Sequence, residues 1–207
     1  MAHIPDGVLS MPVLVAGGVA TAAALGWSLR GLDEDSLPRV AVLAALFFVA
    51  SLINVAIGPT TVHLLLAGLM GLVIGWGTVP AVFVALILQA VFFGFGGIST
   101  LGVNTITIAL PGVLWALAAA PLLRRARTPG RVAAIGAAVA MLSVLTTALL
   151  VATVLAISDP AYLASAKLVL VTYLPLILAE GLIVGFAYGF LARVSPDILR
   201  PLRGANA

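Results

Sequence analysis

The stretch VAAIGAAVAMLSVLTTALLVATVLAI at residues 132–157 runs for 26 residues without a charged side chain. About 20 consecutive apolar residues are enough for an α-helix to cross the hydrocarbon core of a bilayer. The whole chain has this character, because 63% of its 207 residues are apolar and only 8% are charged, against about 25% in soluble domains. Its mean hydropathy is +1.26. The sequence therefore predicts an all-α integral membrane protein and excludes a water-soluble fold or a separate soluble catalytic domain.

Apolar runs separated by charges, Gly and Pro predict about seven transmembrane helices. We expect a single membrane domain over residues 1–207, in which residues 1–10 form an N-terminal segment before the first helix. The predicted spans are residues 11–29, 40–57, 61–76, 80–95, 105–123, 132–157 and 168–192. The third and fourth spans are short and lie between Gly and Pro residues, which leaves open that one of them is tilted, broken or shallow.

The basic residues indicate the orientation, because Lys and Arg accumulate on the cytoplasmic side of membrane proteins. With seven spans and the N-terminus outside, the outer segments hold only Lys167 among the ten basic residues. The nine on the inner side are Arg30, Arg39, Arg124, Arg125, Arg127, Arg131, Arg193, Arg200 and Arg203. We therefore expect an outer N-terminus and a cytoplasmic C-terminus. The first ten residues lack the features of a cleaved signal peptide, so we expect the start to be retained, apart from Met1.

The chain has no cysteine and two histidines, His3 and His63. The absence of cysteine excludes disulfides, thiolate metal sites and cysteine nucleophiles. Both histidines fall on the predicted outer side. If Met1 is removed, the Ala2 amine, the backbone nitrogen of His3 and the His3 imidazole can chelate a metal, and the His63 imidazole can complete a square plane. Four such nitrogens suit Ni(II) or Cu(II) and can accommodate Co(II).

If Met1 is retained, its amine, two amide nitrogens and the His3 imidazole already supply four nitrogens. His63 would then be displaced to an axial or outer position. A simpler alternative is that each histidine forms ordinary hydrogen bonds near the membrane interface. In either metal-binding arrangement the ion should be lost at acid pH, because the ligands must shed protons.

The Gly-rich stretch 96–104 could be a lid over this site or a plain loop. Ser99, Thr100 and Asn104 could donate or accept hydrogen bonds around the imidazoles. Asp6 is a better candidate for a turn former than for a ligand, although it could also reach toward His3.

Glu180 lies near the middle of the last predicted span. Burying a carboxylate there costs about 2.5–3.5 kcal/mol on insertion scales, so it needs a partner. Lys167 is about 20 Å away along the same helix and cannot serve. We favour a structural hydrogen-bond anchor over a metal ligand.

Several motifs together resemble the CbiM/NikM family, the cobalt- and nickel-capturing membrane subunits of energy-coupling-factor (ECF) transporters. They cover almost the entire chain and are His3-Ile4-Pro5-Asp6-Gly7, Gly58-Pro59-Thr60-Thr61-Val62-His63-Leu64, the stretch GFGGISTLGVN at 94–104, and Glu180-Gly181. The resemblance implies a seven-helix fold whose N-terminal segment enters the bundle, with His3 and His63 as metal ligands. The family pattern begins Met-His, so Ala2 is a departure that preserves the ligand set only if Met1 is removed.

The resemblance also implies partners in the cytoplasmic membrane of a prokaryote. These are a coupling subunit (CbiQ/NikQ-like), an ATPase (CbiO/NikO-like) and a possible small accessory membrane subunit (CbiN/NikN-like), and nucleic acid is not among them. The chain itself contains no G-x-x-x-x-G-K-[ST] phosphate loop. Ala16, Ala20 and Ala24 repeat every four residues, which permits close helix contact. A stripe of this type meets the coupling subunit in related transporters, although the first helix is rich in Ala throughout.

The leading hypothesis is capture of Ni(II) or Co(II) outside, with nickel slightly favoured by the Ile4-Pro5-Asp6-Gly7 form, followed by ATP-driven uptake. The alternative is a stand-alone secondary metal transporter or channel. Such a protein normally carries several intramembrane ionisable groups, and only Glu180 falls in this class here. An enzyme is disfavoured, because His-Glu-x-x-His is absent and few side chains could form a nucleophile with its base.

Overall fold

The computed structural model describes residues 3–53, 55–57 and 60–195. Met1, Ala2, Gly58, Pro59, Arg200 and Arg203 lie outside the described residues. The described elements are α1 (Met11–Arg30), α2 (Leu37–Leu52), β1 (Val55–Ile57), β2 (Thr60–Val62), α3 (Ala67–Ile74), η1 (Gly75–Gly77), α4 (Thr78–Phe93), α5 (Leu101–Arg125), α6 (Pro129–Ser158), η2 (Pro160–Tyr162) and α7 (Leu163–Val194).

Five helical segments of the described chain are long and apolar enough to cross a membrane. They are Met11–Arg30, Ala67–Phe93, Leu101–Arg125, Pro129–Ser158 and Pro160–Val194. The remaining apolar helix, α2, has 16 residues and is about 24 Å long, short of the roughly 30 Å of the hydrocarbon core. The prediction of an all-helical membrane architecture is confirmed, whereas seven full spans are not observed.

The predicted second span, residues 40–57, is too long, because α2 ends at Leu52 and residues 55–57 form β1. The predicted third span, residues 61–76, was also wrong. Its first residues belong to the antiparallel hairpin β1–β2, in which Val55 pairs with Val62, and α3 has only eight residues. Gly75 then adopts a φ of +53°, a conformation that suits Gly and ends α3 before the chain continues through η1 into α4. All eight residues of α3 are buried. This run is therefore apolar because protein surrounds it, and it forms one apolar segment with α4.

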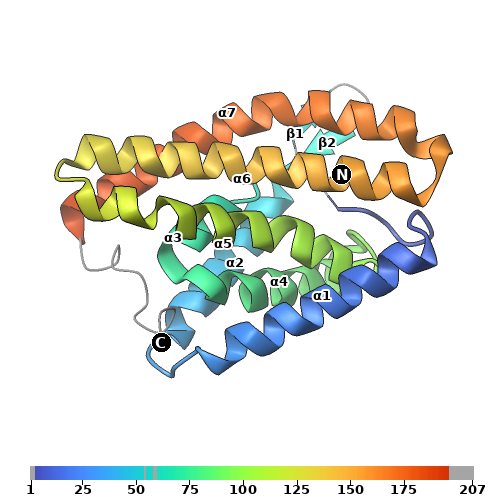
Figure 1. Ribbon diagram of the computed structural model, residues 1–207, viewed down its shortest axis with the longest axis horizontal. Helices are drawn as coiled ribbons and strands as arrows, with labels where there is room; N and C mark the ends of the chain where they lie inside the picture. Colours follow the sequence, from blue (N-terminus) through green and yellow to red (C-terminus); the bar gives the residue numbers. More distant parts are fainter. Residues whose placement is uncertain (1–2, 54, 58–59, 196–207) are drawn as a thin grey trace.

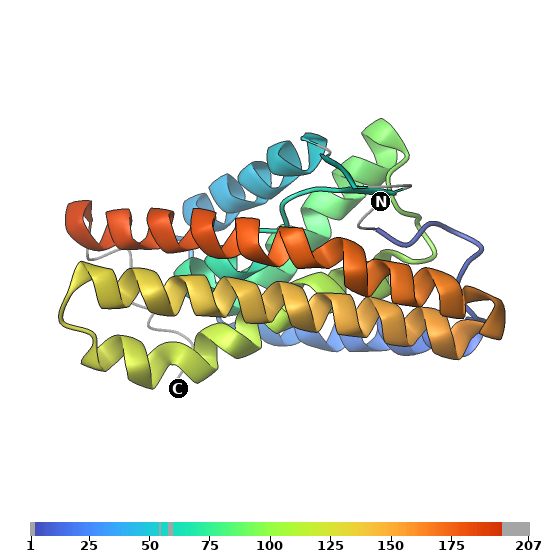
Figure 2. The same ribbon diagram turned by 90° about the horizontal axis from the view of Figure 1, so that it is seen from above.

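The two longest helices, α6 and α7, lie antiparallel and side by side in both ribbon views (Figures 1 and 2). Gly181, Gly185 and Gly189 recur every four residues on the face of α7 that meets α6. An added Cβ at any of them would collide with Met141, Ala137 or Ala133 on α6. Small residues at this spacing let two membrane helices approach closely, so this stripe determines the distance between α6 and α7.

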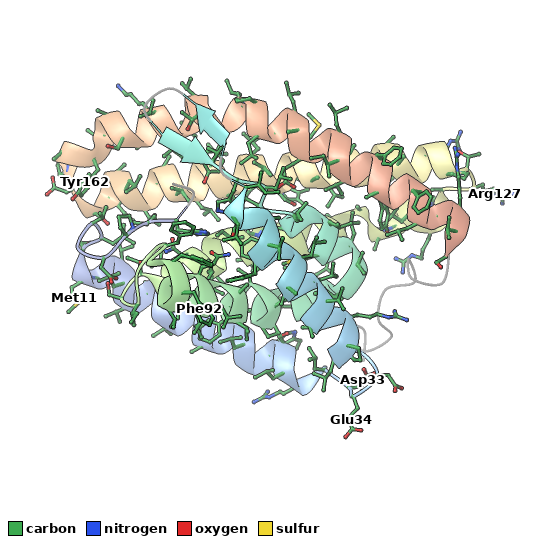
Figure 3. The ribbon with its side chains drawn as sticks, turned by 180° about the vertical axis from the view of Figure 1, so that it is seen from behind. Met11, Asp33, Glu34, Phe92, Arg127 and Tyr162 are labelled. Atoms are coloured by element: carbon green, nitrogen blue, oxygen red, sulfur yellow. The ribbon has the colours of Figure 1, made fainter. Side chains whose placement is uncertain are left out.

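The opposite ends of the molecule carry different segments (Figure 3). Asp33, Glu34 and Arg127 lie toward one end, whereas Met11 and Tyr162 lie toward the other. The N-terminal segment leaves the start of α1 at the second end and turns back toward the β1–β2 hairpin (Figure 1). The fold thus brings the start of the described chain, at His3, against the connection between α2 and α3.

Candidate metal centre

The two histidines meet inside the protein. The Nε2 atoms of His3 and His63 are 3.0 Å apart, and the ring centroids are 4.8 Å apart. Only 4% of His3 and 3% of His63 are exposed. The prediction that these residues, 60 positions apart, lie together is therefore confirmed by the geometry.

The hydrogen bonds of His63 define which of its nitrogens has a free lone pair. Its Nδ1 lies 2.9 Å from the carbonyl oxygen of Leu64. A carbonyl oxygen can only accept, so Nδ1 carries the proton and Nε2 has the lone pair. In the contact between the two rings, His3 Nε2 is accordingly the donor and His63 Nε2 the acceptor. His63 thus presents a nitrogen lone pair to a buried position, as a metal ligand must.

Both imidazoles are held in the neutral form. Burial lowers the pKa of His3 well below the usual 6.5, and the neighbouring His63 lowers it further. Burial likewise lowers the pKa of His63, against a smaller opposing effect from its hydrogen bond to Leu64. Neutral imidazole is the form that binds Ni, Cu and Co ions, so burial keeps this pair competent for metal to more acidic pH than an exposed histidine.

The segment that carries His3 is docked onto the start of α5. The Asn104 side chain accepts a hydrogen bond from Ile4 N at 3.0 Å and donates one to Ile4 O, also at 3.0 Å. The Thr100 hydroxyl donates to the same carbonyl at 2.7 Å. Asn104 and Thr100 therefore bond the backbone next to His3 rather than an imidazole nitrogen.

Asp6 forms the outer part of the same docking surface. It accepts hydrogen bonds from Ile98 N at 3.2 Å, Ser99 N at 2.9 Å and the Ser99 hydroxyl at 2.5 Å. The Ser99 hydroxyl, helped by the two backbone N–H groups, holds the pKa of Asp6 below its usual value. An added Cβ at Gly97 would collide with the Asp6 carboxylate, so a Gly is needed here for the segment to dock. Residues 96–104 thus receive the N-terminal segment.

Glu180 positions the loop that carries His63. Its Oε1 accepts hydrogen bonds from Leu65 N and from Leu66 N, the latter at 2.8 Å, and the side chain is fully buried in α7. Leu66, the residue before α3, has a φ of +50°, which is strained for a non-Gly residue. The carboxylate therefore holds the two N–H groups just before the short helix, including that of the strained Leu66, close in the chain to His63.

The predicted helix-contact residues Ala16 and Ala20 are exposed on α1, whereas Ala24 is partly buried against the core. In the described part of the chain no group of three or more His, Cys, Asp or Glu side chains could hold a metal together. The two imidazoles would therefore need additional nitrogen ligands from the backbone or the chain start.

The sequence analysis did not single out Phe47, which packs against the His63 ring, or the buried polar pair Gln89 and Ser51. Gln89 of α4 is fully buried and donates to the Ser51 hydroxyl oxygen at 2.8 Å, and the Phe47 ring packs edge-on at 6.3 Å from the His63 ring. Glu180 was noticed because it is a single polar side chain within an apolar helix, and the same criterion could have identified Gln89.

Comparisons with known proteins agree with this architecture. A family model described as "CbiM: Cobalt uptake substrate-specific transmembrane region" matches residues 3–198. A putative cobalt transport protein CbiM 1 of Methanocorpusculum labreanum is 31% identical over 97% of this chain and 93% of its own length. The crystal structure of a truncated transition metal transporter superposes with a TM-score of 0.68 at 23% identity, covering 94% of this chain and 98% of that chain, which shows a common fold.

Other relatives align over shorter regions. A putative metal transport protein of Haemophilus influenzae is 46% identical over 54% of each chain. A fused nickel transport protein NikMN of Rhodobacter capsulatus is 42% identical over 56% of this chain, and the match covers only 35% of the fused protein. The aligned part of this chain thus corresponds to about half or less of these two relatives.

Proposed function

Because this chain belongs to the CbiM family, a family of multi-pass membrane transport components rather than enzymes, we propose that it captures Ni(II) or Co(II) for an ECF-type importer. The observation that carries this proposal is the buried pair of neutral imidazoles, with the His63 lone pair aimed at His3. Nickel is slightly favoured over cobalt by the Ile4-Pro5-Asp6-Gly7 form of the N-terminal segment, since the ligands alone do not distinguish the two ions. The ion is the transported substrate.

The proposed ligands are the Ala2 amine, the backbone nitrogen and imidazole of His3, and the His63 imidazole. Two imidazoles alone leave the coordination incomplete, and His3 lies next to the chain start, where an amine is available after removal of Met1. In the alternative with Met1 retained, its amine takes the place of the Ala2 amine and His63 moves to an outer position.

We further propose that the ion enters from the outside, with the metal centre toward that face and the C-terminus in the cytoplasm of a prokaryotic cell. The basic residues support this orientation, since Arg127 lies toward the end of the bundle opposite Met11 (Figure 3).

The proposed partners are a CbiQ/NikQ-like coupling subunit, a CbiO/NikO-like ATPase and a small CbiN/NikN-like membrane subunit. The fused NikMN relative supports the last of these, because its name joins the two components. Ala16 and Ala20, exposed on α1, are candidates for contact with the coupling subunit. A stand-alone secondary transporter remains the competing function, and uptake that persists without any ATPase subunit would favour it.

Metal stoichiometry tests the proposal directly. We expect the purified full chain to retain about one Ni(II) or Co(II) in equilibrium dialysis and His3→Ala or His63→Ala to abolish retention, whereas Asp159→Asn, an exposed change, has no effect. Extending the chain before Ala2, which blocks its amine, should also abolish binding. Unchanged stoichiometry in both histidine variants would refute the site, and intact-mass spectrometry of the loaded protein would identify the ion and the state of Met1.

A further inference from the structure

The connection between α5 and α6 carries a concentrated positive charge. Four of the ten basic residues of the chain fall within eight positions, and they are Arg124, Arg125, Arg127 and Arg131. All four are exposed, and Figure 3 shows Arg127 at one end of the bundle. The sequence contains no Asp or Glu between Asp35 and Asp159, so this basic cluster has no acidic neighbour nearby in the chain.

The fold does not supply the missing negative charge either. Among the described residues, no carboxylate forms an ion pair with any arginine of the basic cluster, and none of the four side chains donates a hydrogen bond. The bond in this region comes from the backbone N–H of Arg131, which donates to the Thr128 hydroxyl at 3.4 Å. Like charges this close in the chain repel one another, so a bound anion would stabilise this end of the molecule.

A cavity of about 330 Å³ lies where the chain turns from α5 into α6. Its lining residues are Leu122 and Arg125 of α5, Ala126 of the connection, and Arg131, Ala134 and Ile135 of α6. Two arginines of the basic cluster thus stand beside an apolar lining of Leu, Ala and Ile side chains. Sites for small molecules measure about 300–1,000 Å³, so the cavity has room for a headgroup rather than a single ion.

The length of α6 places this cavity at the surface of the membrane. The helix has 30 residues and is about 45 Å long, which matches the roughly 40–45 Å of a bilayer together with its headgroup layers. Its first two turns therefore lie where the headgroups meet the hydrocarbon. Arg131 falls in the first turn, at the depth of the headgroups, whereas Ala134 and Ile135 lie about 5–6 Å deeper along the helix.

We propose that this cavity binds an anionic phospholipid, whose phosphate group contacts Arg125 and Arg131 and whose first acyl carbons lie against the apolar lining. Guanidinium groups bind phosphate through paired hydrogen bonds, and basic pockets between membrane helices bind anionic headgroups. A free phosphate ion would use the arginines but not the apolar lining, so the lining favours a lipid. Such a site would hold lipid whether or not the chain captures a metal ion.

Native mass spectrometry of the full chain in detergent tests this site. The probes are phosphatidylglycerol, which is anionic, and phosphatidylcholine, which has the phosphate but no net charge. We expect one phosphatidylglycerol to bind about 20–30-fold more tightly, since each arginine near the surface contributes about fivefold. Arg125→Gln/Arg131→Gln should remove most of this preference. Arg30→Gln/Arg39→Gln is the matched control, because it removes the same charge from two exposed residues that do not line the cavity.

Filling the cavity tests the site without changing its charge. Ala134→Phe places a ring in the lining and should weaken phosphatidylglycerol binding as much as the double arginine change does. Ala138→Phe should have no such effect, because Ala138 is also exposed but lies one turn farther along α6, outside the lining. Circular dichroism should show the same helix content in every variant.

Four results would overturn the lipid site. The first is equal affinity of the wild type for the two lipids, and the second is an equal loss in Ala134→Phe and Ala138→Phe. The third is displacement of the lipid by millimolar inorganic phosphate, which would show a site for a soluble anion. The fourth is a preference for phosphatidylglycerol that survives in Arg125→Gln/Arg131→Gln, which would leave these arginines for an acidic segment of a protein partner.

Discussion

Two different anchors bring the histidines together, one for each side of the metal centre. On the His3 side, the neutral amide of Asn104 pairs with both backbone groups of Ile4, and every bond is between uncharged groups. On the His63 side, a single carboxylate oxygen of Glu180 receives two backbone N–H groups, while its Oε2 has no partner among the described residues. Both anchors act on backbone beside a histidine rather than on the histidine itself.

The difference shows which side of the site depends more on its anchor. Ile4 can keep one bond through Thr100 if Asn104 is lost, because that hydroxyl also donates to its carbonyl. Leu65 and Leu66 have no such second acceptor among the described residues, since both N–H groups donate to the same oxygen of Glu180. Leu66 also needs support for its φ of +50°. We therefore expect the His63 side to be the more fragile.

The largest effect is expected from Glu180→Ala. Two buried backbone N–H groups would lose their acceptor, at about 1–3 kcal/mol each. Metal retention should be lost and the free energy of unfolding in detergent should fall by several kcal/mol. Glu180→Gln keeps an oxygen that can accept, so it should lose less than half as much. An Ala variant as stable as the wild type would show that Glu180 is not an anchor.

Asn104→Leu should have an intermediate effect. The substitution is close in volume but leaves the Ile4 N–H without its partner, which costs about 1–3 kcal/mol for a buried donor. We expect weaker metal binding with the helical bundle intact, measured by dialysis alongside circular dichroism. The control is Thr107→Val, a buried residue one turn farther along α5 whose hydroxyl bonds only within its own helix. Equal losses in both variants would contradict a specific docking role.

Asp6→Asn should have the smallest effect, about 0.5 kcal/mol or less, because the carboxylate is exposed to solvent. The pKa of Asp6 is lowered in the folded protein, so its contribution is complete above the ordinary Asp pKa of about 3.9 and is lost as pH falls through the lowered value. Metal affinity of the Asn variant should be slightly weaker at neutral pH. If Asp6→Asn weakened metal binding as much as Asn104→Leu, Asp6 rather than Asn104 would be the main anchor of the segment that carries His3.

The sequence predicted most helices correctly because their signal is local. Residues 132–157, for example, lie within α6, and residues 168–192 lie within α7. The third predicted span failed because hydropathy measures removal from water and cannot tell lipid from protein as the surroundings. Residues 67–74 are apolar because they are buried in the protein core, and they form only two turns of helix.

The candidate site, like the fold, was predicted from the sequence only in part. That His3 and His63 would share one side of the membrane followed from counting spans and charges, and Glu180 was expected to be a hydrogen-bond anchor. Only the structure showed that Glu180 bonds the Leu65–Leu66 backbone. It also showed that Thr100 and Asn104 bond the Ile4 backbone and that Ser99 bonds Asp6, where the sequence predicted contacts with the imidazoles.

The sequence by itself determined that this chain is a membrane protein with two histidines and no cysteine. Apolar content and residue counts do not depend on how the segments pack. Only the tertiary structure decided which atoms meet. The N-terminal segment and the loop before α3 must converge before a lone pair of His63 can face His3. Hydrogen bonds act over about 3 Å, so such pairings depend on the placement of segments tens of residues apart.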